Sequence, residues 1–295
     1  MPIRWAELAE RRPPERRFAW QNWLPTGAVT ALYGPGGVGK SLLAQQLATA
    51  VALDRPFLGE PTDGRPVLAI FAEEDDVELW RRQERIVRDL GIGLAALDGR
   101  LFLQGRFGRT NLLAERRFGR LEEGPFLASL RDACTEHRPG LLVLDNVALL
   151  FGGDENDRGE VSRFVGMLGR IAQDHDCAVL IVGHTAKAEG SEYSGSTAWN
   201  AAVRSRWLLQ RPPADKRGAR AERIVLARVK SNYAPPAELE LLWRDGILAL
   251  AAAEPRDRLA EDLRQRRAMQ RVLDGLDDPR IGRSRRRALM SDLRE

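Results

Sequence analysis

The chain has 295 residues, of which 43% are hydrophobic, so it is long enough for one large α/β domain with appendages. A formal net charge of +4 weakly favours a polyanionic partner. No apolar run approaches the roughly 20 residues of a membrane-spanning helix, and the N-terminal residues lack the apolar core of a signal peptide. The two cysteines, Cys134 and Cys177, have no metal-ligand spacing, which is typical of a reduced cytoplasmic protein.

Short β-like runs alternate with amphipathic helical stretches from Val29 onward, which predicts a mostly parallel sheet with helices on both faces. The expected strands are Val29–Tyr33, Val67–Phe71, Leu101–Gln104, Leu141–Leu144 and Ala178–Val182. The expected helices lie near Lys40–Leu53, Val77–Leu90, Phe126–His137 and Arg158–Asp174. Later strand-like runs without long helices predict antiparallel additions to the sheet: Arg206–Gln210, Ile224–Lys230, Leu239–Trp243 and Ile247–Leu250.

The pattern divides the chain into three parts. Residues 1–24 are expected to form a polar arm that packs against the core through Trp5, Trp20 and Trp23. Residues 25–253 are expected to form the α/β domain. Residues 254–295 are rich in arginine and helical in pattern, and they predict a basic C-terminal tail.

A phosphate-binding loop is the most specific motif. Gly34–Ser41 fits Gly-x-x-x-x-Gly-Lys-Ser/Thr at every fixed position and lies between an expected strand and an expected helix. Backbone N–H groups and the helix N-terminus would surround phosphates, Lys40 would reach the β- and γ-phosphates, and Ser41 would hold Mg²⁺. The sequence therefore predicts a nucleoside triphosphate site built by Gly34, Pro35, Gly36, Gly37, Val38, Gly39, Lys40, Ser41 and Leu42.

Acidic side chains follow two other expected strands. Asp145 ends the strand that begins at Leu141 and is expected to support Mg²⁺ beside Ser41. Glu73 follows the strand ending at Phe71 and is the candidate that activates the attacking water, with Glu74 as the alternative. Both glutamates would otherwise stabilise the N-terminus of the next helix, the role expected for Asp75 and Asp76.

His184 ends the expected strand that begins at Ala178, where it would face the γ-phosphate side, unless it is a simple surface histidine. The small-residue loop 190–196 follows it. In a ring-forming motor, Lys187 and Tyr193 would contact a DNA backbone there; a plain surface loop is the alternative.

Cations near the ends of the later strands are candidates for reaching a neighbouring subunit's γ-phosphate. They are Arg206, Arg228 and Lys230, and ordinary surface cations are the competing interpretation.

Together these motifs resemble the RecA-fold ATPases of the plasmid-type, RepA-like replicative helicase family, which are P-loop ATPases of mobile elements. The resemblance covers about Trp23 to Ala251. It rests on the phosphate loop together with seven further short segments. In chain order these are Trp23–Pro25, Ala72–Asp76, Leu144–Asn146, Gly183–Lys187, Ser194–Ala198, Ala202–Trp207 and Val229–Tyr233.

This resemblance implies a homohexameric ring that hydrolyses ATP with Mg²⁺ at subunit interfaces. It assigns phosphate binding to Lys40 and Ser41, water activation to Glu73 and metal support to Asp145. It makes His184 a nucleotide sensor and Arg206 an arginine finger, with Lys230 also reaching across the interface. The family usually has one glutamate followed by an aspartate at this position. This chain has two glutamates, which leaves Glu73 and Glu74 as alternatives for water activation.

The function expected on this basis is a DNA helicase or translocase that acts on single-stranded DNA during replication of a mobile element. The alternative is a RecA-fold ATPase that binds DNA in recombination, repair or regulation without unwinding it. A small-molecule kinase also uses such a loop, but nothing near His184 or Arg206 favours one.

Overall fold

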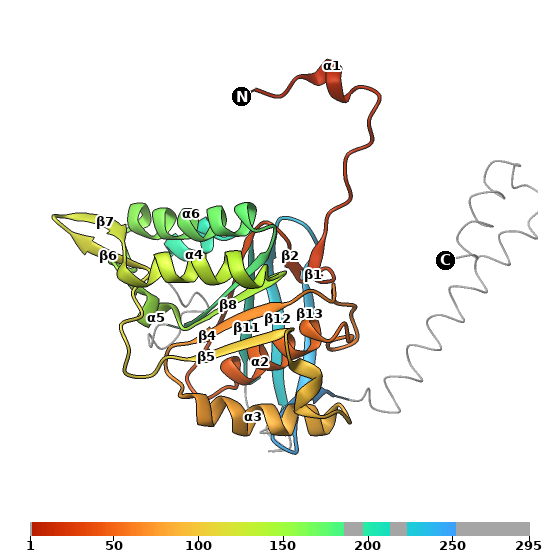
Figure 1. Cartoon of the computed structure of the whole chain (residues 1–295). Helices are drawn as coiled ribbons and strands as arrows, with labels where there is room; N and C mark the ends of the chain where they lie inside the picture. Colours follow the sequence, from red (N-terminus) through yellow and green to blue (C-terminus); the bar gives the residue numbers. More distant parts are fainter. Residues whose placement is uncertain (1, 186–196, 213–222, 252–295) are drawn as a thin grey trace, which may run out of the picture. The chain divides into compact units, whose positions relative to one another are not determined.

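The computed structural model describes residues 2–185, 197–212 and 223–251. A nine-stranded sheet runs through the domain (Figure 1). In spatial order its strands are β14 (Ile247–Leu250), β13 (Ala237–Arg244), β12 (Arg223–Ser231), β11 (Ser205–Gln210), β3 (Val29–Gly34), β10 (Ala178–His184), β8 (Leu141–Asp145), β4 (Val67–Phe71) and β5 (Leu101–Gly105). The predicted α/β fold with a RecA-like, mostly parallel sheet is confirmed.

The predicted antiparallel additions are present, and the first of them also has a parallel neighbour. The strand at Arg206–Gln210 was expected among the antiparallel additions, and β11 does pair antiparallel with β12, but its other partner, β3, is parallel to it. The pairs β12–β13 and β13–β14 are antiparallel. The short helix α7 (Thr197–Ala202) lies between β10 and β11 in the chain. Such a crossover connection lets β11 enter the sheet parallel to β3.

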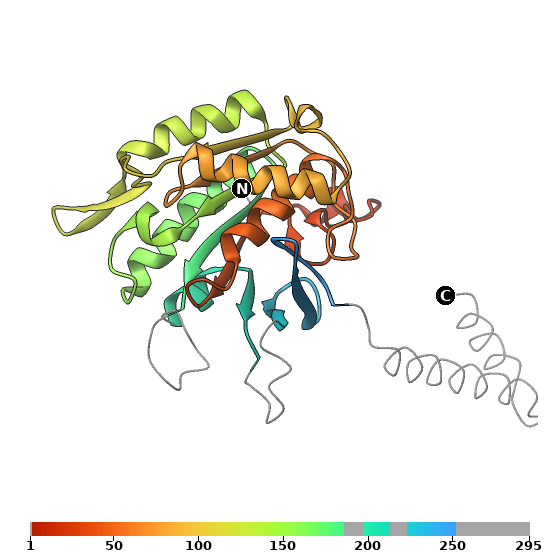
Figure 2. The same ribbon diagram turned by 90° about the horizontal axis from the view of Figure 1, so that it is seen from below.

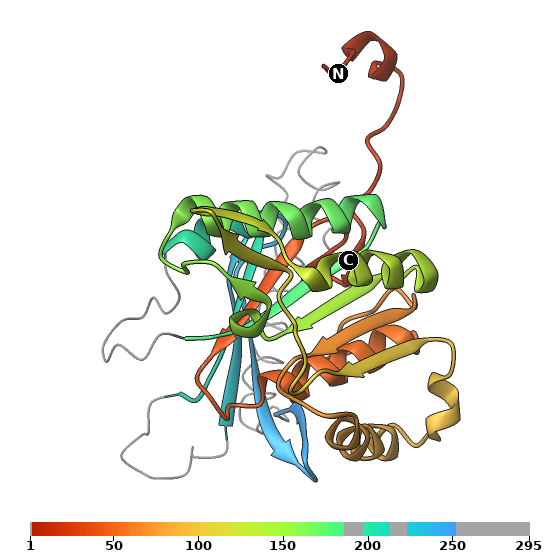
Figure 3. The same cartoon turned by 60° about the vertical axis from the view of Figure 1, so that its left-hand side comes forward.

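Helices cover both faces of the sheet (Figures 1 and 3). One face packs against α2 (Lys40–Ala52) and α3 (Asp76–Asp89), and the other against α4 (Pro125–His137), α6 (Arg158–Asp174) and α7. The strands between them are buried on both sides, as in Val67–Phe71, which explains their continuous apolar runs. The short 3₁₀ helix Leu94–Leu97 leads into β5.

The carboxyl ends of the central strands lie at one edge of the sheet. His184 on β10 pairs with Gly34 on β3, and Asp145 on β8 pairs with Val182 on β10 and Phe71 on β4. The residues that follow these strand ends are thereby brought together, although they come from segments far apart in the chain.

The predicted N-terminal arm is partly integrated into the domain. The short strands β1 (Phe18–Trp20) and β2 (Leu24–Pro25) pair with each other, and the rings of Trp20 and Trp23 stack with centroids 4.7 Å apart. Trp207 of β11 packs edge-on against both. Trp5, in the four-residue helix α1 (Trp5–Leu8), does not pack as expected, because 73% of it is exposed.

A small second sheet was not predicted. It contains the hairpin of β6 (Ala114–Arg117) and β7 (Arg120–Glu123), and β6 also pairs with β9 (Phe151–Gly152). The helical turn α5 (Val147–Leu150) joins β8 to β9. The hairpin extends away from the main sheet and its helices (Figures 1 and 2).

Cys134 and Cys177 are buried and form no disulfide, and burial raises the pKa of each thiol to about 12. Within the described ranges, no helix combines the length and apolar character needed to cross a membrane. Residues 1–250 form one compact unit, and the predicted basic tail lies outside the described residues.

Candidate nucleotide site

The loop Gly34–Ser41 connects β3 to α2 in the predicted strand–loop–helix arrangement. Gly37 and Gly39 have φ angles of 71° and 102°, in the left-handed region that favours glycine. A side chain at Gly34 would place its Cβ 2.2 Å from the carbonyl oxygen of Leu209, so the approach of β11 requires glycine there. The loop backbone can therefore present its N–H groups beside the N-terminus of α2, an arrangement that binds phosphate.

The remaining predicted loop residues divide into an exposed tip and a buried anchor. Pro35 and Gly36 are exposed at the tip, while Val38 and Leu42 are buried in the core formed by the sheet and α2. The buried side chains of Val38 and Leu42 hold the loop against the core, and the tip of the loop stays open to solvent.

The Lys40 ammonium lies at the centre of the site. Its Nζ donates to the carbonyl oxygens of Gly34 at 2.9 Å and Pro35 at 3.0 Å. Burial lowers the pKa of Lys40, while the negative charges of Asp145 and Glu73 raise it in part. A cation held among acids and backbone groups is well placed to bind phosphate oxygens.

Asp145 ends β8 and is buried, as predicted for a metal-supporting acid. Burial raises its pKa to about 6, and a hydrogen bond from Ser41 opposes this shift. Within the described part of the chain, its Oδ2 atom has no hydrogen-bond partner. A buried carboxylate oxygen without a partner, beside a serine hydroxyl, fits a site for Mg²⁺.

The structure separates the two glutamates after β4. Glu73 is exposed to the site, and its charge acts on Lys40, Asp145 and His184. Glu74 instead forms an ion pair with Arg82 of α3. This geometry favours Glu73 over Glu74 as the group that faces a bound phosphate.

The two acids that follow take the structural role expected of them. Asp75 caps α3 by accepting a hydrogen bond from the backbone N–H of Glu78 at 2.7 Å. The Asp76 carboxylate accepts one from the N–H of Gly105 at 2.8 Å, which ties β5 to the start of the helix.

His184 lies at the end of β10, between two polar side chains. Its Nδ1 is 3.3 Å from the Lys40 ammonium, which can only donate. The side-chain amide nitrogen of Asn146, also a donor, lies 3.2 Å from Nε2, so a neutral ring can accept from only one of these two neighbours. Burial and the Lys40 charge lower the pKa of the imidazole, which favours the neutral ring.

The loop opens onto a cleft of about 370 Å³. Both glutamates line it, together with Lys40, Ser41 and His184. It is also lined by residues that the sequence analysis did not select: Arg82, Arg85, Trp243 and Gly246. Trp243 comes from β13, which lies near α2 with β14 in Figure 2. A Cβ on Gly39 would be 3.1 Å from the Trp243 ring. An exposed aromatic face at the mouth of a phosphate loop can stack a nucleobase.

No sequence signal identifies Trp243, because it lies about 200 residues after the loop on a strand with ordinary alternation. Asn146 could have been selected from the sequence, because it directly follows the predicted metal-supporting residue Asp145.

A family model described as an AAA domain (AAA_25) matches residues 1–190. The chain belongs to this AAA-domain family. Membership supports a P-loop ATPase that binds nucleotide, in agreement with the loop and the cleft. The residues present also fit the nucleotide and its metal, because the loop and the Lys40 ammonium line the cleft and the partnerless buried oxygen of Asp145 belongs to a carboxylate bonded to Ser41.

Not every predicted site residue of this AAA-domain chain reaches the cleft. Arg206 was expected to be offered to a neighbouring subunit, but it is only 5% exposed. Its register partner on β3 is Ala31, three residues before Gly34, and its guanidinium lies 5.5 Å from the centre of the Tyr33 ring. The structure therefore does not place Arg206 where a finger in trans must lie.

Lys230 and Arg228 are likewise engaged within their own chain. The Lys230 ammonium donates to the carbonyl oxygens of Asn200 and, at 2.8 Å, Val203, and so it satisfies the C-terminal end of α7. Arg228 is 4% exposed and donates to the carbonyl oxygen of Pro235 at 2.9 Å. Both side chains stabilise this domain, which does not fit the predicted reach across an interface.

The predicted DNA-contact residues Lys187 and Tyr193 lie outside the described residues, as does the small-residue loop 190–196.

Proposed function

We propose that this chain is a Mg²⁺-dependent ATPase that acts on single-stranded DNA as a ring-forming helicase or translocase in the replication of a mobile element. The observation that supports its ATPase part is that Lys40, Glu73 and His184 line one cleft, with the buried Asp145 hydrogen-bonded to Ser41 of the same cleft. The DNA and replication parts rest on the resemblance to plasmid-type replicative helicases.

The proposed roles follow from the contacts of each group. The loop backbone and Lys40 bind the triphosphate, and Ser41 with Asp145 holds the metal. When bound, Mg²⁺ neutralises charge that develops on the phosphates. The Trp243 face packs against the base, at the side of the cleft that faces Gly39.

The hydrolytic step needs a carboxylate that orients water and accepts its proton. Glu73 takes this role, because it is exposed to the cleft and is not held by Arg82. The His184 imidazole donates a hydrogen bond to a phosphate oxygen and so distinguishes the triphosphate from the diphosphate.

The variant Glu73→Gln is expected to lower kcat for ATP by at least about 10²-fold with little change in nucleotide affinity, because glutamine cannot accept the proton. The matched variant Glu74→Gln removes the ion pair with Arg82 and is expected to keep kcat within about threefold. Steady-state kinetics and nucleotide binding measure the two effects. A reversed result would assign water activation to Glu74.

We also propose that several copies of the chain assemble into a ring and hydrolyse ATP at the boundaries between subunits. Since Arg206 and Lys230 are engaged within their own chain, the proposal assigns neither of them as the cation supplied by a neighbour.

Strand displacement tests the helicase part. The wild-type chain is expected to unwind a forked DNA duplex when ATP and Mg²⁺ are present, and Glu73→Gln is expected not to. The mass of the particle, measured with ATP and single-stranded DNA, is expected to be that of a ring. ATP hydrolysis stimulated by single-stranded DNA without displacement would instead support the DNA-binding ATPase that does not unwind.

A further inference from the structure

The tip of the β6–β7 hairpin carries an unusual aromatic residue. Phe118 is 100% exposed, with φ 47°, and Gly119 follows with φ 76°. The flanking Arg117 and Arg120 pair with each other across the hairpin. The strands are therefore joined by a two-residue turn in which both central residues have positive φ.

Phenylalanine is a poor choice for this turn on structural grounds. Asn-Gly and Asp-Gly are the favoured pairs, because asparagine and aspartate tolerate the left-handed region while a bulky side chain is strained in it. Phe118 also gains nothing from burial, since its ring contacts solvent on all sides. A strained and wholly exposed aromatic residue indicates a binding role.

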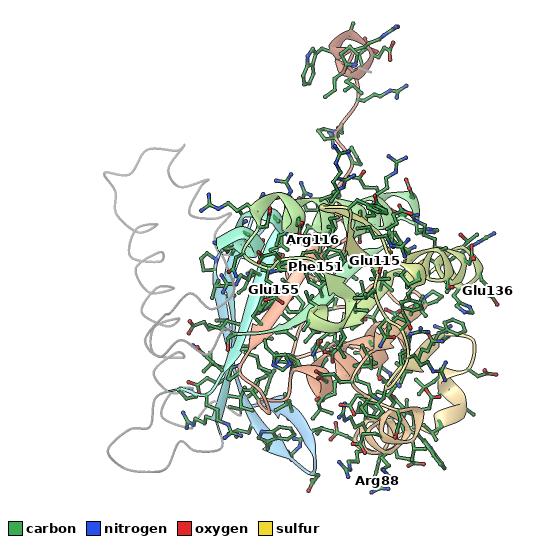
Figure 4. All side chains as sticks on the ribbon, turned by 90° about the vertical axis from the view of Figure 1, so that its left-hand side faces the viewer. Arg88, Glu115, Arg116, Glu136, Phe151 and Glu155 are labelled. Atoms are coloured by element: carbon green, nitrogen blue, oxygen red, sulfur yellow. The ribbon has the colours of Figure 1, made fainter. Side chains whose placement is uncertain are left out.

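The charges of the hairpin are arranged with cations toward the tip and acids toward the base. Arg116 pairs with Glu160 of α6 at 2.8 Å, with Asp154 and Asp157 nearby, and Arg117 pairs with Glu115. Figure 4, viewed from the side toward which the hairpin extends, labels Glu115 and Arg116 near Phe151 of β9.

Among the described residues, Arg120 has no ion pair at all. It flanks the ring together with Arg117. To bind a phosphate, Arg117 would exchange its partner Glu115 for it, while Arg120 needs no such exchange.

The hairpin is also connected to the nucleotide cleft through a short path. Leu113, which precedes β6, donates from its backbone N–H to the carbonyl oxygen of Leu150 in α5 at 2.8 Å. The side chain of Asn146 caps α5 and lies beside His184. One helical turn thus separates Asp145 from the strand that supports the hairpin.

We infer that the hairpin tip binds single-stranded nucleic acid, with a base stacked on Phe118 and the adjoining phosphates bound by Arg117 and Arg120. An aromatic face flanked by guanidinium groups fits an unpaired base, whatever its identity, because every base presents a π-face. This inference rests on the proposed DNA-directed function and names the part of the chain that contacts the strand.

The test is Phe118→Asn, assayed with a labelled oligothymidylate by fluorescence anisotropy. Asparagine suits the turn, so the melting temperature is expected to be equal or higher by about 2 °C. The affinity is expected to fall about tenfold through loss of one stacked base. Phe118→Tyr, which keeps the ring, is expected to restore the affinity. Trp80→Ala is the control for loss of an exposed aromatic side chain elsewhere.

The double variant Arg117→Gln with Arg120→Gln is expected to weaken binding and to reduce its dependence on salt. An unchanged affinity of Phe118→Asn would overturn the inference, as would equal wild-type affinity for duplex DNA. A loss of oligomer mass in Phe118→Asn, with oligothymidylate binding retained, would overturn it in favour of a contact between copies.

The two proposals can fail separately. If the wild-type chain hydrolyses no ATP but binds oligothymidylate through Phe118, the inference stands and the proposed ATPase function fails. If hydrolysis depends on Glu73 while Phe118→Asn binds oligothymidylate normally, the inference alone fails.

Discussion

Replacing Lys40 with alanine is expected to lower kcat/KM for ATP by about 10³- to 10⁵-fold. Loss of one group that stabilises transition-state charge costs about 10²- to 10³-fold in turnover. Loss of a charge-assisted hydrogen bond to a phosphate costs roughly another 10- to 100-fold in binding. The side chain already lies at the loop, within hydrogen-bond distance of the carbonyl oxygens of Gly34 and Pro35.

The measurement is steady-state ATP hydrolysis together with the rise in melting temperature caused by bound nucleotide. Arg88→Ala is a suitable control, because Arg88 is an exposed cation of α3 (Figure 4) and does not line the cleft. It is expected to leave both quantities unchanged. Retained hydrolysis by Lys40→Ala would place the ATPase site somewhere other than this loop.

Replacing Asp145 with asparagine is expected to lower ATP hydrolysis by about 10³-fold while stabilising the metal-free protein. The loss of activity reflects the loss of metal-ion catalysis, which contributes several kcal/mol. The gain in stability follows from the partnerless carboxylate oxygen, which is buried at a cost in desolvation.

The raised pKa of Asp145 makes the stability of the fold depend on pH in a defined direction. The pKa of Asp145 is raised from 3.8 to about 6 in the folded protein, mainly by burial. As the pH rises from about 4 to 6, the unfolded chain ionises at this position before the folded chain does, so the wild-type fold loses stability over that window. Above it, Asp145→Asn is expected to be more stable than wild type by on the order of 2–3 kcal/mol.

Denaturant unfolding without metal or nucleotide, at pH 4 and pH 7.5, measures this difference. The advantage of the asparagine variant is expected at pH 7.5 and nearly absent at pH 4. Asp132→Asn, on the exposed side of α4, is the control and is expected to show no such dependence. A variant less stable than wild type at pH 7.5 would show that the Asp145 charge stabilises the fold even without a metal.

Most of the main sheet follows from local pattern. The strand Val67–Phe71 and the helix Arg158–Asp174 were predicted with the observed bounds, because continuous apolar runs and amphipathic periodicity are properties of neighbouring residues. The β6–β7 hairpin escaped prediction, since its strands carry mixed charges and its turn lacks the favoured residues.

The candidate site was predictable wherever a short motif defines it. The loop Gly34–Ser41 and the acid at the end of β8 have fixed local spacing, and parallel strands bring their carboxyl ends to one edge. The roles expected for Arg206 and Lys230 depended on exposure, which is decided by the packing of β11 and β12 and not by the residues' own neighbours in sequence.

The sequence by itself determined that this chain has a phosphate loop, an α/β sheet and an acid poised at the end of β8, since these depend on residues close together in the chain. Only the tertiary structure decided that Glu74 is held by Arg82, that Trp243 borders the loop and that Phe118 stands exposed at a hairpin tip. Such facts depend on strand register and on contacts between distant segments, which local pattern does not encode.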